Sequence, residues 1–107
     1  MMIFLLAFAA TSSAPYTCPQ TKTDDLIACA TSKYKKADAT LNAVWKRMPH
    51  TAEIVKAQRA WLAYRDAMCE AENSASPDGS LYPVFRYLCW AELTDEQVKR
   101  LSEIAQR

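Results

Sequence analysis

One stretch, from residue 57 to residue 69, constrains the fold more than any other part of this sequence. It contains no glycine, no proline and no β-branched residue, so its helix propensity is high throughout. When the stretch is extended back to residue 54, larger or apolar side chains recur at three- and four-residue steps, at Ile54, Ala57, Trp61, Tyr64 and Met68. This is the spacing of one helix face. We therefore predict a central helix against which the rest of the chain packs.

Length and composition indicate a single exported domain. The chain has 107 residues, enough for one domain, and its single glycine argues against a turn-rich β fold. Its net charge of +1 provides no basic surface for nucleic acid. The apolar run over residues 3–10, followed by small residues, predicts a signal peptide over 1–14 and a mature domain over 15–107. That run is too short to span a membrane.

The hydrophobic spacing predicts an all-α fold, a small disulfide-linked helical bundle. A long helix from about Asp24 to Met48 comes first, and its short connection to the central helix favours antiparallel packing. After a loop over 73–80, two shorter helices are expected, one over 81–92 and one opening at the capping box 94–97. The bundle thus has two long antiparallel helices and two shorter ones. Its predicted core comprises Tyr34, Leu41, Val44, Trp61, Tyr64, Met68, Phe85, Leu88 and Leu101.

An even number of cysteines behind an export signal indicates two disulfides. Four cysteines allow three pairings. We predict Cys18–Cys29 and Cys69–Cys89, because each pair joins sequence neighbours across a turn or loop; a Cys29–Cys69 crosslink is the alternative. No pair has Cys-x-x-Cys spacing and the only histidine, His50, lies in a predicted loop, so we expect no metal site.

The sequence offers no catalytic motif, but it does predict a polar contact between the two long helices. There is no Gly-x-Ser-x-Gly turn and no glycine-rich phosphate loop, so we expect neither enzyme activity nor a cofactor. Arg65 lies beside the apolar face, and a partly buried arginine needs a polar partner. The simplest partner is Asp38 of the first long helix, with Asn42 and Gln58 bonding in the same seam.

The sequence resembles the LprI-like lysozyme-inhibitor family over about residues 18–101. The residues that carry this resemblance are Cys29, Tyr34, Ala37-Asp38, Leu41-Asn42, the segment 57–66, Cys69, Gly79-Ser80, Cys89, Leu93-Thr94 and Leu101. The resemblance implies a small helical, disulfide-linked protein, periplasmic or secreted, whose partner is a lysozyme. The alternative is an envelope protein-interaction module that inhibits no lysozyme. Neither the oligomeric state nor the lysozyme type follows from the sequence.

The distribution of charge suggests where a basic partner would bind. Residues 22–59 hold eight basic and four acidic side chains, whereas residues 66–96 hold seven acidic side chains and one basic. The loop over 73–80 lies inside the acidic segment, with its base held by the predicted Cys69–Cys89 bridge. A stapled loop loses less entropy on binding than a free one. We therefore predict a partner-binding surface at Glu70, Glu72, Asp78, Gly79 and Ser80.

Overall fold

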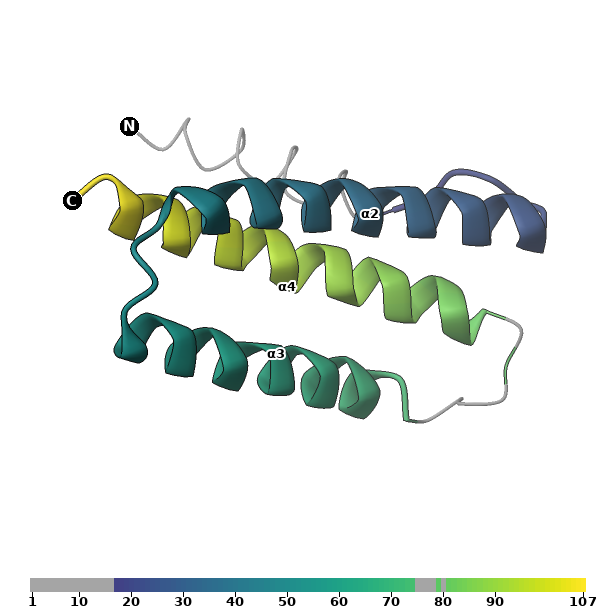
Figure 1. Ribbon diagram of the computed structural model, residues 1–107. Coiled ribbons are helices and arrows are strands. Elements are labelled where there is room, and N and C mark those ends of the chain that lie inside the picture. The colour runs from purple at the N-terminus through teal and green to yellow at the C-terminus, as the bar shows by residue number, and fades with distance from the viewer. Residues whose placement is uncertain (1–16, 75–78, 80) are drawn as a thin grey trace, which may run out of the picture.

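The computed structural model describes residues 17–74, 79 and 81–107 of the chain, so the predicted signal peptide over 1–14 lies outside the described residues. The described part is helical and contains no strand, which confirms the all-α prediction. Its helices are α2 (Thr23–Arg47), α3 (Ala52–Glu72) and α4 (Tyr82–Ala105). Figure 1 shows α2 and α3 running in opposite directions, with α4 lying between them. None of the described helices has an apolar stretch long enough to cross a bilayer.

The prediction of two shorter helices after the loop was wrong, because both belong to the single helix α4. The residues at 94–97 have the pattern of a capping box, yet Thr94 is completely buried inside α4. Its hydroxyl accepts a hydrogen bond from Arg65 of α3 instead of capping a helix. No glycine or proline occurs between Val84 and Ala105 to interrupt the helix. The helix therefore continues through the predicted boundary.

The ends of the long helices follow from local sequence. The Thr51 hydroxyl accepts a hydrogen bond from the backbone N–H of Ile54 at 3.2 Å, which caps the start of α3. Charges in the first and last turns of α2 complement its dipole; they are Asp24, Asp25, Lys46 and Arg47. Pro49 follows Met48, the residue that caps the end of α2, where the chain turns toward α3.

The main hydrophobic core lies at the end of the bundle where α2 and α4 finish. Its buried members are Leu41, Val44, Met48 and Leu101. Partly buried side chains from all three helices pack against them, namely Trp45, Ile54, Trp61, Val98 and Ile104. The α2 members recur at three- and four-residue steps, which is the spacing of one buried helix face.

The core prediction was correct in part. Leu41, Val44 and Leu101 are buried, and four further members are half-buried: Tyr34, Trp61, Met68 and Leu88. Tyr64 and Phe85 were wrongly placed in the core, because they are 50% and 51% exposed.

The buried face of α3 explains why Tyr64 points outward. Cys69 is completely buried, and Arg65, one turn earlier, shares its helix face. Successive residues are rotated by about 100° around a helix, so Tyr64 is turned away from that face. Phe85 differs, because it lies one turn before the buried Cys89 on the same side of α4 and is nevertheless 51% exposed in the first turn of that helix.

Candidate functional site

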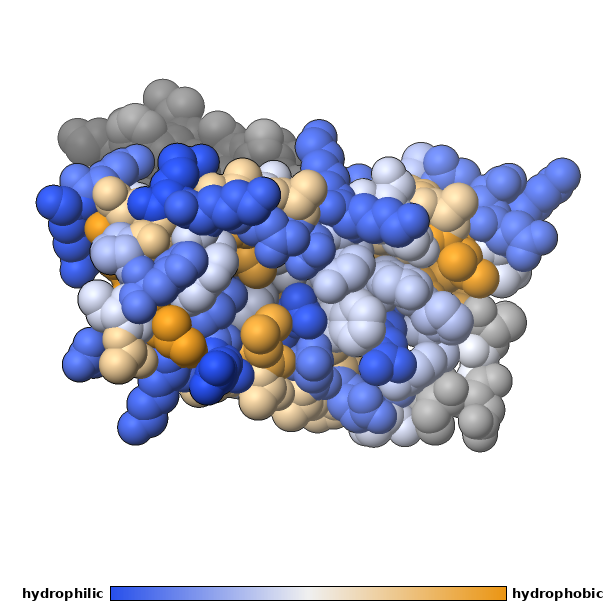
Figure 2. Space-filling model, viewed as in Figure 1, coloured by the Kyte–Doolittle hydropathy of each residue, from blue (hydrophilic) through white to orange (hydrophobic). Residues whose placement is uncertain are grey.

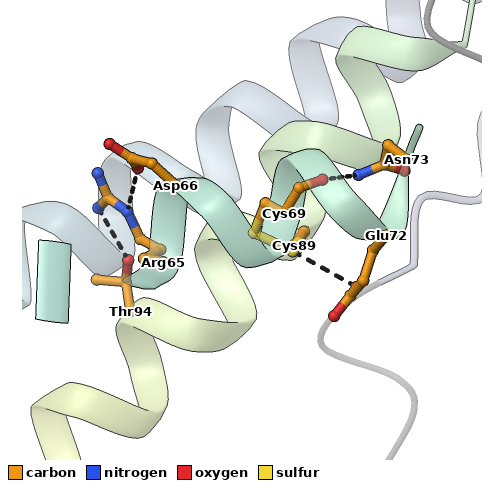
Figure 3. Close-up of a disulfide and its surroundings, with 7 residues drawn as sticks. All are labelled: Arg65, Asp66, Cys69, Glu72, Asn73, Cys89 and Thr94. Atoms are coloured by element: carbon orange, nitrogen blue, oxygen red, sulfur yellow. Dashed lines mark hydrogen bonds and ion pairs between the residues drawn. A yellow bond between two sulfur atoms is a disulfide. The ribbon is translucent and has the colours of Figure 1, made fainter. Parts of the chain in front are cut away.

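One end of the bundle, where α3 finishes and α4 begins, carries Glu70, Glu72 and Glu92 and is called the acidic end. A disulfide between α3 and α4 lies at this end. Cys69 and Cys89 are joined across the loop that connects these helices, with their Cα atoms 5.7 Å apart (Figure 3). A second disulfide, Cys18–Cys29, fastens the segment before α2 to that helix. Both pairings are those predicted, and the Cys29–Cys69 alternative is excluded. The end of α3 is therefore covalently held against α4.

The predicted partner-binding residues that the structure describes lie at this end. Glu70 and Glu72 are exposed at the end of α3, and Gly79 is exposed in the loop. The Glu72 Oε1 lies 3.6 Å from the disulfide-bonded Cys89 sulfur, so this carboxylate lies beside α4 (Figure 3). The structure thus brings Glu72 to the disulfide, while Asp78 and Ser80 fall outside the described residues.

The amide of Asn73 closes the end of α3. Its Nδ2 donates a hydrogen bond to the backbone carbonyl of Cys69 at 2.8 Å. Carbonyl groups in the last turn of a helix lack intrahelical partners, and this bond satisfies one of them. The chain therefore leaves α3 from a well-defined position next to the disulfide.

Glu92 of α4 joins this acidic group, although the sequence analysis did not select it. Burial raises the pKa of the Glu92 carboxyl above its usual range, and the carboxylates of Glu96 and Glu72 raise the pKa further. Glu72 and Glu92 therefore act on each other electrostatically across two helices. A usable signal was present in the sequence, because Cys89 and Glu92 are one helical turn apart. The predicted disulfide already implied that Glu92 lies near the end of α3.

Among the charged residues that the structure describes, Arg65 is the most deeply buried. It is 8% exposed, and its Nε donates to Asp66 Oδ1 at 3.0 Å. One terminal nitrogen donates to Thr94 Oγ1 of α4 at 3.4 Å (Figure 3). The guanidinium also lies 5.3–5.7 Å from the centres of three aromatic rings, one from each helix: Tyr34, Trp61 and Trp90. These distances lie within the range of cation–π interactions.

The prediction of a polar seam between α2 and α3 was wrong, because Arg65 and Gln58 have other partners. Arg65 pairs with its neighbour Asp66, and no ion pair joins it to Asp38 within the described part of the chain. Gln58 accepts a hydrogen bond from the side chain of Gln97 at 2.8 Å, whereas Asn42 is exposed. The physical reason is that α4 lies between α2 and α3 (Figure 1). The polar seam thus joins α3 to α4.

The buried residues around Arg65 and the glutamates at the acidic end have different roles. Arg65 is enclosed and its donors face Asp66, Thr94 and the three rings, so it stabilises the contact between helices. Glu70, Glu72 and Glu92 lie at the surface, and the structure holds them at one end of the bundle. The acidic end is therefore the candidate site for a partner with positive charge.

Comparison with known proteins identifies the family of this chain. The family described as lysozyme inhibitor LprI matches residues 17–101. An uncharacterized protein of Rhizobium meliloti (strain 1021) is 31% identical over 99 aligned positions, which cover 75% of this chain and 71% of the relative. No solved structure matches significantly. The chain therefore belongs to the LprI family of lysozyme inhibitors.

Proposed function

We propose that this protein binds and inhibits a lysozyme in the bacterial periplasm or outside the cell. The match to the lysozyme-inhibitor family over residues 17–101 carries this proposal. The two disulfides support the location, because disulfides persist in oxidising compartments such as the periplasm. With these crosslinks the small bundle reaches its partner already ordered.

The acidic end is the proposed contact surface. Lysozymes of the animal type are basic, and a complementary acidic patch accelerates association with a basic protein. The net charge of +1 gives no attraction from the protein as a whole, so any attraction must come from local charge. Glu70 and Glu72 supply such charge next to the Cys69–Cys89 disulfide, and the loop residues Asp78, Gly79 and Ser80 follow them in the chain.

The direct test is titration of the oxidised mature protein into a lysozyme assay that follows the clearing of a bacterial cell-wall suspension. We expect inhibition that increases with protein concentration. A correctly folded, oxidised protein that leaves the lysozyme rate unchanged would refute the proposal and favour a non-inhibitory envelope module.

A matched pair of variants tests the contact surface. Glu70→Ser/Glu72→Ser removes two charges at the acidic end, and Glu53→Ser/Glu103→Ser removes two exposed charges at the opposite end. Both variants change the net charge equally, so they differ only in where the charge is lost. We expect weaker inhibition for the first pair, further weakened by adding Asp78→Ser. Equal inhibition by both pairs at low and moderate salt would direct attention to the lysines of α2, Lys33, Lys35 and Lys36.

A further inference from the structure

A groove with a volume of about 500 Å³ opens beside the acidic end. Figure 2 shows a hydrophobic patch at this end of the molecule, near the start of α2, and further hydrophobic patches in the middle and toward the other end of the visible face. The first turns of α4 supply most of the apolar wall, and carboxylates from α3 and α4 lie next to it. The lining residues used below are Leu81, Val84, Phe85, Leu88, Glu72 and Glu92.

The apolar wall of the groove is accessible and rigidly supported. Phe85 is 51% exposed and Leu81 is 37% exposed, although both are large hydrophobic side chains. Cys18 and Cys89, one from each disulfide, also line the groove. One disulfide joins the segment before α2 to that helix, and the other joins α3 to α4, so the walls of the groove are covalently linked in pairs. A preformed groove loses little entropy when it receives a ligand.

The charge on the groove selects the kind of ligand. Its described lining contains two carboxylates, Glu72 and Glu92, and no basic side chain. The repulsion among Glu72, Glu92 and Glu96 would be relieved by a cation brought between them. An anionic ligand would be repelled, and a purely apolar ligand would leave the two carboxylates partly desolvated and unpaired. The best match combines an apolar group with a nearby positive charge.

We propose that this groove receives an apolar side chain of a basic protein partner, while an adjacent lysine or arginine of that partner pairs with Glu72 and Glu92. The inference rests on the proposed lysozyme inhibition and names the surface that recognises the enzyme. Phe85 then acts as the apolar anchor, and the two glutamates determine which charged segment docks beside it. Aromatic anchors of this kind dominate the binding energy of many interfaces.

Three single variants test the groove with an animal-type lysozyme as the probe. Phe85→Ser removes the exposed anchor, and Glu92→Gln removes one charge with little change in shape. Tyr64→Ser is the matched control, because Tyr64 is equally exposed on α3 and does not line the groove. We expect the Kd to rise about tenfold for Phe85→Ser and by a smaller factor for Glu92→Gln. The effect of Glu92→Gln should disappear in high salt, and Tyr64→Ser should bind like the wild type.

Thermal melts recorded alongside the binding assay show that each variant is folded. If folded Phe85→Ser and Glu92→Gln bind lysozyme as tightly as Tyr64→Ser, the groove inference is overturned while the proposed inhibition stands. If the wild type self-associates and Phe85→Ser is monomeric, the groove is an interface between two copies of this chain, and the inference is overturned in that way.

A second measurement separates the groove from the proposed function. N-acetyl-leucyl-arginine amide is titrated into the 15N-labelled wild type, and N-acetyl-leucyl-glutamate amide serves as the charge-reversed control. Amide shifts at Val84, Leu88 and Glu92 with the arginine compound alone support the groove, even if lysozyme is not inhibited and the proposed function has failed. Equal shifts with both compounds, or none with either at millimolar concentration, overturn the charge-selective groove.

Discussion

Replacing Arg65 by alanine tests whether the contact between α3 and α4 depends on this buried side chain. Arg65 is 8% exposed, donates to Asp66 and Thr94, and lies against three aromatic rings. The side chain of Asp66 is 56% exposed, so its carboxylate returns to water when Arg65 is removed. Because its Asp66 partner is exposed, this ion pair itself contributes little to the free energy of unfolding. The cost of the substitution must come from the other contacts.

Those contacts give a loss of about 3 kcal/mol in the free energy of unfolding. The hydroxyl of Thr94 is completely buried, and leaving it without Arg65 costs about 1–3 kcal/mol. The cation–π contacts of the single guanidinium together contribute about 1–2 kcal/mol. Removal of the aliphatic part of the side chain adds a packing loss. For a domain of this size, about 3 kcal/mol lowers Tm by about 12–24 °C.

Thermal unfolding followed by circular dichroism measures the effect. Arg59→Ala is the matched control, because Arg59 is exposed on the same helix and its loss should change stability by less than about 0.5 kcal/mol. Arg65→Lys keeps the charge but loses the planar guanidinium, so it should fall between the two alanine variants. An Arg65→Ala protein with the same Tm as Arg59→Ala would refute the reasoning. If that protein also lost lysozyme binding, Arg65 would face the partner.

Three further predictions concern the link between α3 and α4. In Cys69→Ala/Cys89→Ala the free energy of unfolding, measured with denaturant, should fall by about 3 kcal/mol. This variant should also bind lysozyme more weakly at a temperature where it is folded. Cys18→Ala/Cys29→Ala is the control, because it removes the other disulfide. Gln97→Ala should lose about 1 kcal/mol, because it removes the hydrogen bond to Gln58, and an unchanged denaturation midpoint would contradict this. Because the pKa of Glu92 is raised in the folded protein, its ionisation destabilises the fold as pH rises through that pKa. Glu92→Gln should therefore melt above the wild type at neutral pH, and thermal scans below about pH 4.3 should show no difference.

The parts of the fold that depend on short-range sequence were predictable. The spacing of apolar residues indicated both long helices, and the positions of the cysteines in the chain indicated both disulfides. The end of α3 was also implied by the turn-forming residues that follow it. These features depend on neighbouring residues, and so a single sequence contains the information needed to find them.

The orientation of each helix depends on its neighbours in space, and here the prediction failed. Two adjacent stripes run along α3, one through Trp61 and Tyr64 and the other through Arg65 and Cys69. Periodicity alone could not show which of them faces inward. Similarly, the pattern beginning at Thr94 fits a helix cap, and only the presence of Arg65 opposite it explains why the hydroxyl is buried inside α4. The partners of Gln58 and Arg65 were misassigned because the central position of α4 was not known.

The position of α4 also connects the stability of the bundle to its candidate binding surface. Arg65 contacts α4 at Thr94, and one turn later along α3 the disulfide joins Cys69 to Cys89. Two contacts so close together on α3 restrict both its rotation and its distance from α4. Glu72, three residues beyond Cys69, consequently lies beside α4, where Glu92 lies three residues beyond Cys89. The buried arginine and the disulfide thus bring carboxylates from two helices together before any partner binds, which offsets part of the entropy cost of forming the complex.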